Sequence, residues 1–73
     1  MPYASNADLL ASVRSHLPGH AQDIFRAAFN HAFESHHSDP RQEEIAHRIA
    51  WSAVKRLYKK VGSSWVQRKE PGD

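Results

Sequence analysis

The chain has 73 residues, no cysteine and a formal net charge of +2. A chain of this length forms one small domain that buries only about 60% of the surface exposed by the unfolded chain, which leaves few residues for a catalytic cleft. Without cysteine it has neither disulfides nor thiolate metal sites, and no apolar run approaches the roughly 20 residues that cross a bilayer. The first residues also lack the basic and apolar segments of a signal peptide. We therefore predict a single cytoplasmic domain spanning residues 1–73.

Charge is distributed unevenly along the sequence. Residues 1–54 contain six acidic and four basic side chains, whereas residues 55–69 contain six basic side chains and no acidic one. A concentrated cationic segment of this kind attracts anionic partners at short range.

The first predicted element is a short helix over residues 9–17, where apolar residues recur at helical spacing. Its apolar residues are Leu9, Leu10, Val13 and Leu17. Asn6 or Asp8 is expected to cap its start. Pro18 and Gly19 are expected to end it, because proline disfavours helix at the preceding residue and glycine tolerates left-handed geometry.

A second helix is predicted over residues 20–36, with His20 as a cap or staple at its start. Its apolar residues follow an i, i+3, i+4, i+7 series and include three phenylalanines, which supply much of the expected core. They are Ala21, Ile24, Phe25, Ala28, Phe29, Ala32 and Phe33. The polar residues on the other side are Asp23, Arg26, Asn30 and Glu34.

A third helix is predicted over residues 40–60, with Asp39 as its cap and Pro40 in the first helical position. Acidic residues occupy its first turns and basic residues its last turns, which is the arrangement that the helix dipole favours. One broad arc of this helix is apolar, and its alanines would let another helix approach closely. The opposite face carries Arg48, Lys55, Arg56 and Lys59.

The pattern changes after residue 60. A turn signal at residues 62–64 precedes the short β-favouring run at residues 65–67. Residues 2–4 form the other short non-helical stretch with an aromatic side chain. On the sequence alone, pairing of these two short stretches stays open, because lone hairpins of this length are marginal.

The predicted core is shared by the three helices. It consists of Leu9, Val13, Leu17, Ile24, Phe25, Ala28, Phe29, Phe33, Ile49, Ala53, Leu57 and Tyr58, with Trp51 and Trp65 beside it. We interpret Trp51, Tyr58 and Trp65 as packing residues of the core and sheet. The alternative is an exposed aromatic patch for a partner.

Three blocks of the sequence resemble the ChaB family. They are Met1-Pro2-Tyr3, LPGHAQDIFRAAFNHAF at residues 17–33, and RQEEIAHRIAWSAVKRLYKK at residues 41–60 with Trp65 shortly after. In the family pattern a Leu-Pro-x-His-Ala-Gln block leads into an Ala-Phe-Asn helix, and an Arg-x-Glu-x-x-Ala-His-x-x-Ala-Trp-x-Ala-Val-Lys helix follows. The similarity covers nearly the whole chain. It departs from the family at Leu10, where proline is frequent, and at residues 34–40, which lack the acid-rich insertion of some members.

The resemblance implies a compact, mainly α, three-helix domain with a minimal β-sheet near the N- and C-termini. On that basis the regions of Tyr3 and Trp65 are expected to pair. The resemblance also implies a small cytosolic regulator of a cation/proton antiporter that acts by protein–protein binding, with the cytoplasmic face of the antiporter as its partner. No cofactor is expected, and the lack of a long apolar run argues against direct membrane insertion.

The basic residues near the C-terminal end form the candidate partner-binding set. This set is Arg48, Lys55, Arg56, Lys59, Lys60, Arg68 and Lys69. It has three interpretations: a solvated helix face, a docking surface for an acidic protein or anionic headgroups, or a surface that follows nucleic-acid phosphates. A small basic nucleic-acid-binding protein is therefore the alternative function. No enzyme is expected, because the sequence has no nucleophile elbow, HExxH motif or paired acids in an apolar setting.

Six histidines raise the question of metal binding or pH sensing. Solvated or capping roles are favoured, and a loose metal site at His36, His37 and Asp39 is a weak alternative. His47 lies at the edge of the apolar arc of the third helix, so we expect it to be a buried, hydrogen-bonded core residue.

Overall fold

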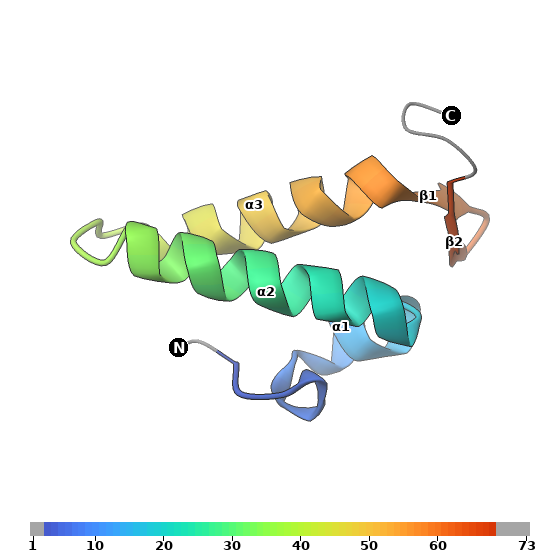
Figure 1. Cartoon of the computed structure of the whole chain (residues 1–73), viewed down its shortest axis with the longest axis horizontal. Coiled ribbons are helices and arrows are strands. Elements are labelled where there is room, and N and C mark those ends of the chain that lie inside the picture. The colour runs from blue at the N-terminus through green and yellow to red at the C-terminus, as the bar shows by residue number, and fades with distance from the viewer. Residues whose placement is uncertain (1–2, 69–73) are drawn as a thin grey trace.

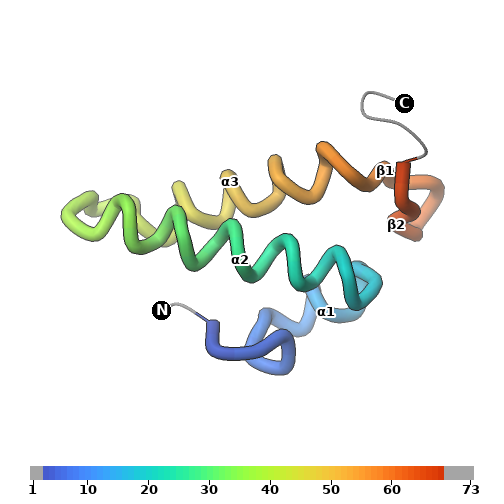
Figure 2. Tube along the Cα trace, viewed as in Figure 1, coloured from blue at the N-terminus to red at the C-terminus, as the bar shows by residue number. Residues whose placement is uncertain are grey.

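A computed structural model describes residues 3–68 of the chain. Its elements, in chain order, are the 3₁₀ turn η1 (Asn6–Asp8), the helices α1 (Ala11–His16), α2 (Gly19–Ser35) and α3 (Gln42–Leu57), and the strands β1 (Tyr58–Val61) and β2 (Ser64–Gln67). The two long helices lie side by side and run in opposite directions, with the hairpin at the far end of α3 (Figure 1). The trace in Figure 2 shows the N-terminal segment following α2 before the chain turns into it. The prediction of a mainly helical domain with three helices and a minimal sheet is confirmed.

The junction between α1 and α2 forms where Pro18 and Gly19 predicted a break, and a glutamine of the second helix completes it. The side-chain amide of Gln22 donates to the carbonyl of Leu17 at 2.8 Å and to that of Arg14 at 3.2 Å. These carbonyls belong to the last turn of α1, which has no further helical donors. Gln22 therefore caps the C-terminal end of the preceding helix.

The predicted caps at the N-terminal ends of the helices were wrong. Asp8 belongs to η1, and its carboxylate accepts a hydrogen bond from the backbone N–H of Ser5 at 3.2 Å. His20 is the second residue of α2 and makes no capping bond; its ring lies 6.4 Å from that of Tyr58. Asp39 accepts from the backbone N–H of Arg41 at 2.7 Å, which is an Asx-turn ahead of the helix rather than a helix cap.

The turn between α2 and α3 is closed by Gln42, the first residue of α3. Its side-chain amide donates to the carbonyl of Phe33 at 2.6 Å, which satisfies an acceptor in the last turn of α2. Asp39 and Pro40 therefore shape the connection, and the helix starts only after them.

The sheet was predicted with the wrong partner strand. β2 pairs with β1, with Tyr58 opposite Gln67 and Lys60 opposite Trp65, and not with the region of Tyr3. α3 ends at Leu57, three residues before the predicted end, because Tyr58 is already extended. Within residues 3–68 only Gly62 has a positive φ, of 63°, and it occupies the first central position of the connecting turn. This is the pattern of a type II′ turn, whose twist suits a two-residue hairpin.

The core lies where α2 and α3 face each other and α1 covers one side. The side chains with the lowest exposure are Leu9, Val13, Leu17, Ala21, Phe25, Phe29, Ala32, Ala46, Ala50, Val54 and Tyr58. The alanines in this set permit the close approach of the long helices. Two predicted core residues of α3 were wrong: Ile49 is 39% exposed and Leu57 is 45% exposed.

Ile49 and Leu57 are exposed because the apolar arc of α3 is wider than α2 alone can cover. The N-terminal segment and α1 pack on the side of Trp51, so burial extends from Val54 toward that side. The opposite edge of the arc, with Ile49 and Leu57, has no element against it among the described residues. Phe29 lies in the core as predicted, 1% exposed.

Candidate functional site

A groove runs between α1 and α3 along the side of α3 that the N-terminal segment approaches. It consists of two cavities of about 590 and 420 Å³, which share Trp51 and Lys55. We call it the α1–α3 groove. The first cavity is lined by Tyr3, Leu10, Phe29, Glu43, Glu44, His47, Arg48, Trp51, Ser52 and Lys55. The second is lined by Ser12, His16, Trp51, Lys55, Lys60 and Trp65.

Aromatic rings form the floor of this groove. The rings of Tyr3 and Phe29 lie 4.8 Å apart, and those of Trp51 and Trp65 lie 5.5 Å apart. Phe25, in the core below, holds Trp51 in an edge contact at 5.3 Å. Since Tyr3, Trp51 and Trp65 are only partly buried, they present apolar ring surface to the groove.

The orientation of Trp51 is fixed by His47, one helical turn earlier. The indole Nε1–H donates to Nε2 of His47 at 3.0 Å. An acceptor nitrogen carries no proton, so this bond selects the tautomer of the imidazole that is protonated on Nδ1. His47 was predicted to be a buried, hydrogen-bonded residue; the hydrogen bond is present, and the ring is half-buried at the wall of the groove.

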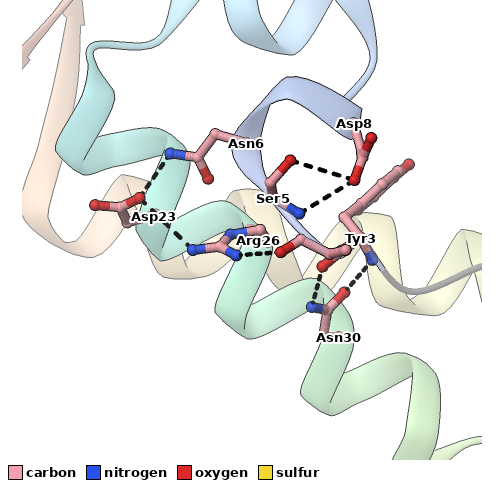
Figure 3. A network of polar contacts seen from close by, with 8 residues as sticks. Tyr3, Ser5, Asn6, Asp8, Asp23, Arg26 and Asn30 are labelled. Carbon is pink, nitrogen blue, oxygen red and sulfur yellow. Dashed lines mark hydrogen bonds and ion pairs between the residues drawn. The ribbon is translucent and has the colours of Figure 1, made fainter.

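Tyr3 reaches the groove because the N-terminal segment is tied to the polar side of α2 (Figure 3). Asn30 accepts from the backbone N–H of Tyr3 and donates to its carbonyl, both at 2.8 Å. Arg26 donates to the carbonyl of Ala4 at 2.9 Å. The polar side of α2 therefore holds the N-terminal segment, a contact that the sequence pattern did not predict.

Tyr3 carries a perturbed phenol. Burial raises its pKa above the ordinary value of 10, and the nearby carboxylate of Glu43 adds to this effect because it disfavours a second negative charge. The Tyr3 hydroxyl is therefore protonated, and able to donate a hydrogen bond, throughout the neutral range.

Charge changes sign along the groove. Glu43 and Glu44 lie at the end where α3 begins, and Glu44 accepts a hydrogen bond from Arg48 at 3.1 Å. Lys55 lies where the two cavities meet, and Lys60 lines the second cavity. The end near the hairpin is therefore cationic, and the end near the start of α3 is acidic.

Only some of the predicted partner-binding residues line the groove. Arg48, Lys55 and Lys60 line the groove, whereas Arg56 is exposed and lines neither cavity. Lys59 and Lys60 lie on β1 rather than on a helix face. The remaining members are Arg68, whose Nε donates to the carbonyl of Lys55 at 3.0 Å, and Lys69, which lies outside the described residues.

The weak alternative of a metal site was not supported by the geometry. Within residues 3–68, no group of three or more histidine or acidic side chains is placed to hold a metal ion. His36, His37 and Asp39 therefore do not converge on a common point. His36 instead accepts a backbone hydrogen bond from Asp39 at 3.0 Å within the turn.

Across the described part of the chain, every helix is too short or too polar to cross a bilayer.

The groove itself was not predicted from the sequence. Leu10 and Tyr3 approach α3 only because the N-terminal segment folds back along α2, which the periodicity of α3 cannot reveal. A signal was present in the polar residues Arg26 and Asn30, which are four residues apart and therefore share one side of α2. Such pairs on a helix are usually solvated, so they did not indicate a second chain segment.

Comparisons of sequence and of structure with known proteins point to the same family. The sequence pattern of the family described as ChaB matches residues 9–68. A relative from Escherichia coli (strain K12), named "Putative cation transport regulator ChaB", is 47% identical over 66 residues, which cover 82% of this chain and 87% of the relative. A relative of the same name from Shigella flexneri matches to the same extent. A structure described as "NMR solution structure of the putative cation transport regulator ChaB" is 41% identical, with a TM-score of 0.81 over 93% of this chain and 100% of the other.

Proposed function

This chain belongs to the ChaB family, and from that membership we propose that it is a cytoplasmic regulator of a cation/proton antiporter. It acts by binding the transporter and catalyses no reaction. The observation that carries the proposal is the 47% identity to relatives named as cation transport regulators, over most of both chains.

The chemistry of the α1–α3 groove supports a binding role. His47, a half-buried base in its wall, accepts a hydrogen bond from the indole of Trp51 rather than from a nucleophile. Glu44 is paired with Arg48 at 3.1 Å on an exposed surface. An acid or base that works in catalysis usually lies near a nucleophile or in an apolar setting that perturbs it. The groove instead offers aromatic surface and charge, which are the usual components of a protein interface.

The test uses the antiporter of the same organism in everted membrane vesicles. Purified protein is added, and cation-driven proton exchange is followed with a pH-sensitive dye. The proposal predicts a saturable change in exchange rate and retention of the protein on vesicles that contain the antiporter, but not on vesicles that lack it. Equal retention on both vesicle types together with unchanged exchange would refute it.

Nucleic-acid binding stays as a second candidate, because residues 55–69 carry six basic side chains and no acidic one. Binding by these residues would weaken steeply with salt, since each neutralised phosphate releases counterions. A gel shift with duplex DNA across a salt series measures this dependence. A failure to bind even at low salt would remove this candidate and leave the regulator proposal as it stands.

A further inference from the structure

We infer that the α1–α3 groove binds an acidic segment of a protein partner, with one large apolar side chain of that segment in the cavity above Phe29 and Trp51. The inference rests on the proposed function, because it names the surface and the partner chemistry through which such a regulator acts. The inference goes beyond the proposed function because it assigns the binding site to this groove.

The first cavity of the groove has an apolar floor and wall. Its volume of about 590 Å³ falls within the usual range of binding pockets, roughly 300–1,000 Å³. Tyr3 and Trp51 supply aromatic surface on the floor, next to the buried ring of Phe29, and Leu10 forms a wall with 51% of its surface exposed. An exposed leucine beside partly buried aromatic rings is apolar surface that a partner would remove from water. The cavity therefore suits a leucine-sized or phenylalanine-sized anchor.

The groove is already formed without a partner. Trp51 is held by its hydrogen bond to His47 at 3.0 Å, and Tyr3 by two hydrogen bonds to Asn30 at 2.8 Å. Side chains fixed in this way lose little further conformational entropy on binding. A preformed aromatic floor favours a defined anchor over nonspecific adhesion.

The charges of the groove favour a partner segment that is acidic at one end. Lys55 and Lys60 line the groove near the hairpin, and among residues 3–68 no acidic side chain lines that end. Glu43 lies about 18 Å from Lys55 along the axis of α3, given a rise of about 1.5 Å per residue. A partner with carboxylates confined to one end of its segment matches this gradient. A nucleic acid that follows the whole groove would place phosphates against Glu43 and Glu44, which is why a protein segment is favoured.

Both tryptophans of the chain, Trp51 and Trp65, line the groove, so their fluorescence reports binding there directly. The probe is a helical peptide of about 12 residues, long enough to span roughly 18 Å, with leucines on one face and glutamates clustered at one end. Two matched peptides replace either the glutamates by lysine or the leucines by alanine. We expect a saturable fluorescence change with the first peptide and binding at least about tenfold weaker with the other two.

The protein variants separate the groove from general charge. Lys55→Glu and Arg56→Glu change neighbouring, exposed residues by the same charge, but only Lys55 lines the groove. Lys55→Glu should weaken binding of the glutamate peptide about tenfold and improve binding of the lysine peptide, whereas Arg56→Glu should leave both nearly unchanged. Leu10→Ser should weaken binding of the leucine peptides only. Thermal melts establish that each variant is folded.

Several outcomes would overturn the inference. They are no saturable binding of the glutamate peptide, equal weakening by Lys55→Glu and Arg56→Glu, or tighter Lys55-dependent binding of duplex DNA or of phosphatidylglycerol vesicles. If antiporter vesicles retain wild-type protein and Lys55→Glu equally, the groove is not the interface and the proposed function stands. If the peptides behave as expected but antiporter vesicles retain neither protein, the proposed function fails and the groove assignment stands.

Discussion

The side-chain amide of Asn30 makes two hydrogen bonds to the backbone of Tyr3, accepting from its N–H and donating to its carbonyl, each at 2.8 Å. A residue in the middle of α2 thereby pairs with an extended segment as a neighbouring strand would. This pairing is what brings the Tyr3 ring against Phe29, at 4.8 Å, and closes one end of the α1–α3 groove.

Loss of this pairing should destabilise the domain and open the groove. Asn30→Ala leaves two half-buried backbone groups of Tyr3 without partners, at a cost of about 1–3 kcal/mol. Asn30→Asp keeps the acceptor but removes the donor, so we expect an intermediate loss. Urea unfolding measures both, and His31→Ala, at the exposed neighbouring position, is the control that should change little. An unaltered midpoint for Asn30→Ala would show that the N-terminal segment contributes nothing to stability.

The backbone of Leu10 suits a proline. Its φ is −54°, and the preceding Leu9 is extended, with ψ of 156°. Leu10→Pro should therefore keep the fold and stabilise it by up to about 0.4–1 kcal/mol, because proline restricts the unfolded chain. Arg14→Pro is the contrasting variant, since the Arg14 N–H donates to Leu10 at 3.0 Å and its loss should cost about 3 kcal/mol. If the two prolines were equally harmful in thermal melts, the described start of α1 would be wrong.

The raised pKa of Tyr3 predicts a loss of stability in alkaline solution. The folded protein holds the phenol proton more tightly than the unfolded chain does, so this contribution is fully present below pH 10 and is lost as the pH rises through the folded pKa. The stability of wild type relative to Tyr3→Phe should be constant at neutral pH and fall above about pH 10. Phenolate absorbance in a Tyr58→Phe background reports Tyr3 alone. Glu43→Gln should shift that titration toward the ordinary value, and an unshifted curve would exclude the carboxylate as a contributor.

The sequence was sufficient for those parts of the fold that follow from local chemistry. The spacing of Phe25 and Phe29 predicted the buried side of α2, and Pro18 with Gly19 predicted the break before it; both are confirmed. The predicted partner strand of β2 was wrong, because the lysines after Leu57 suit the end of a helix as well as a strand. The groove could not be predicted, since it depends on the contact between Asn30 and Tyr3, which are 27 residues apart.

The buried side of α3 is where sequence periodicity and the structure differ most clearly, and a pair of substitutions distinguishes them. Periodicity placed Leu57 in the core, but it is 45% exposed, whereas Val54 is fully buried. Val54→Ala removes two buried methyl groups and leaves a cavity, so it should cost about 2 kcal/mol even though valine is the smaller residue. Leu57→Ala removes more atoms from a half-solvated site and should cost less than about 1 kcal/mol. Urea unfolding at neutral pH gives both values. If Leu57→Ala were the more damaging, α3 would be rotated toward the face that periodicity predicted, and Trp51 could not line the α1–α3 groove as described.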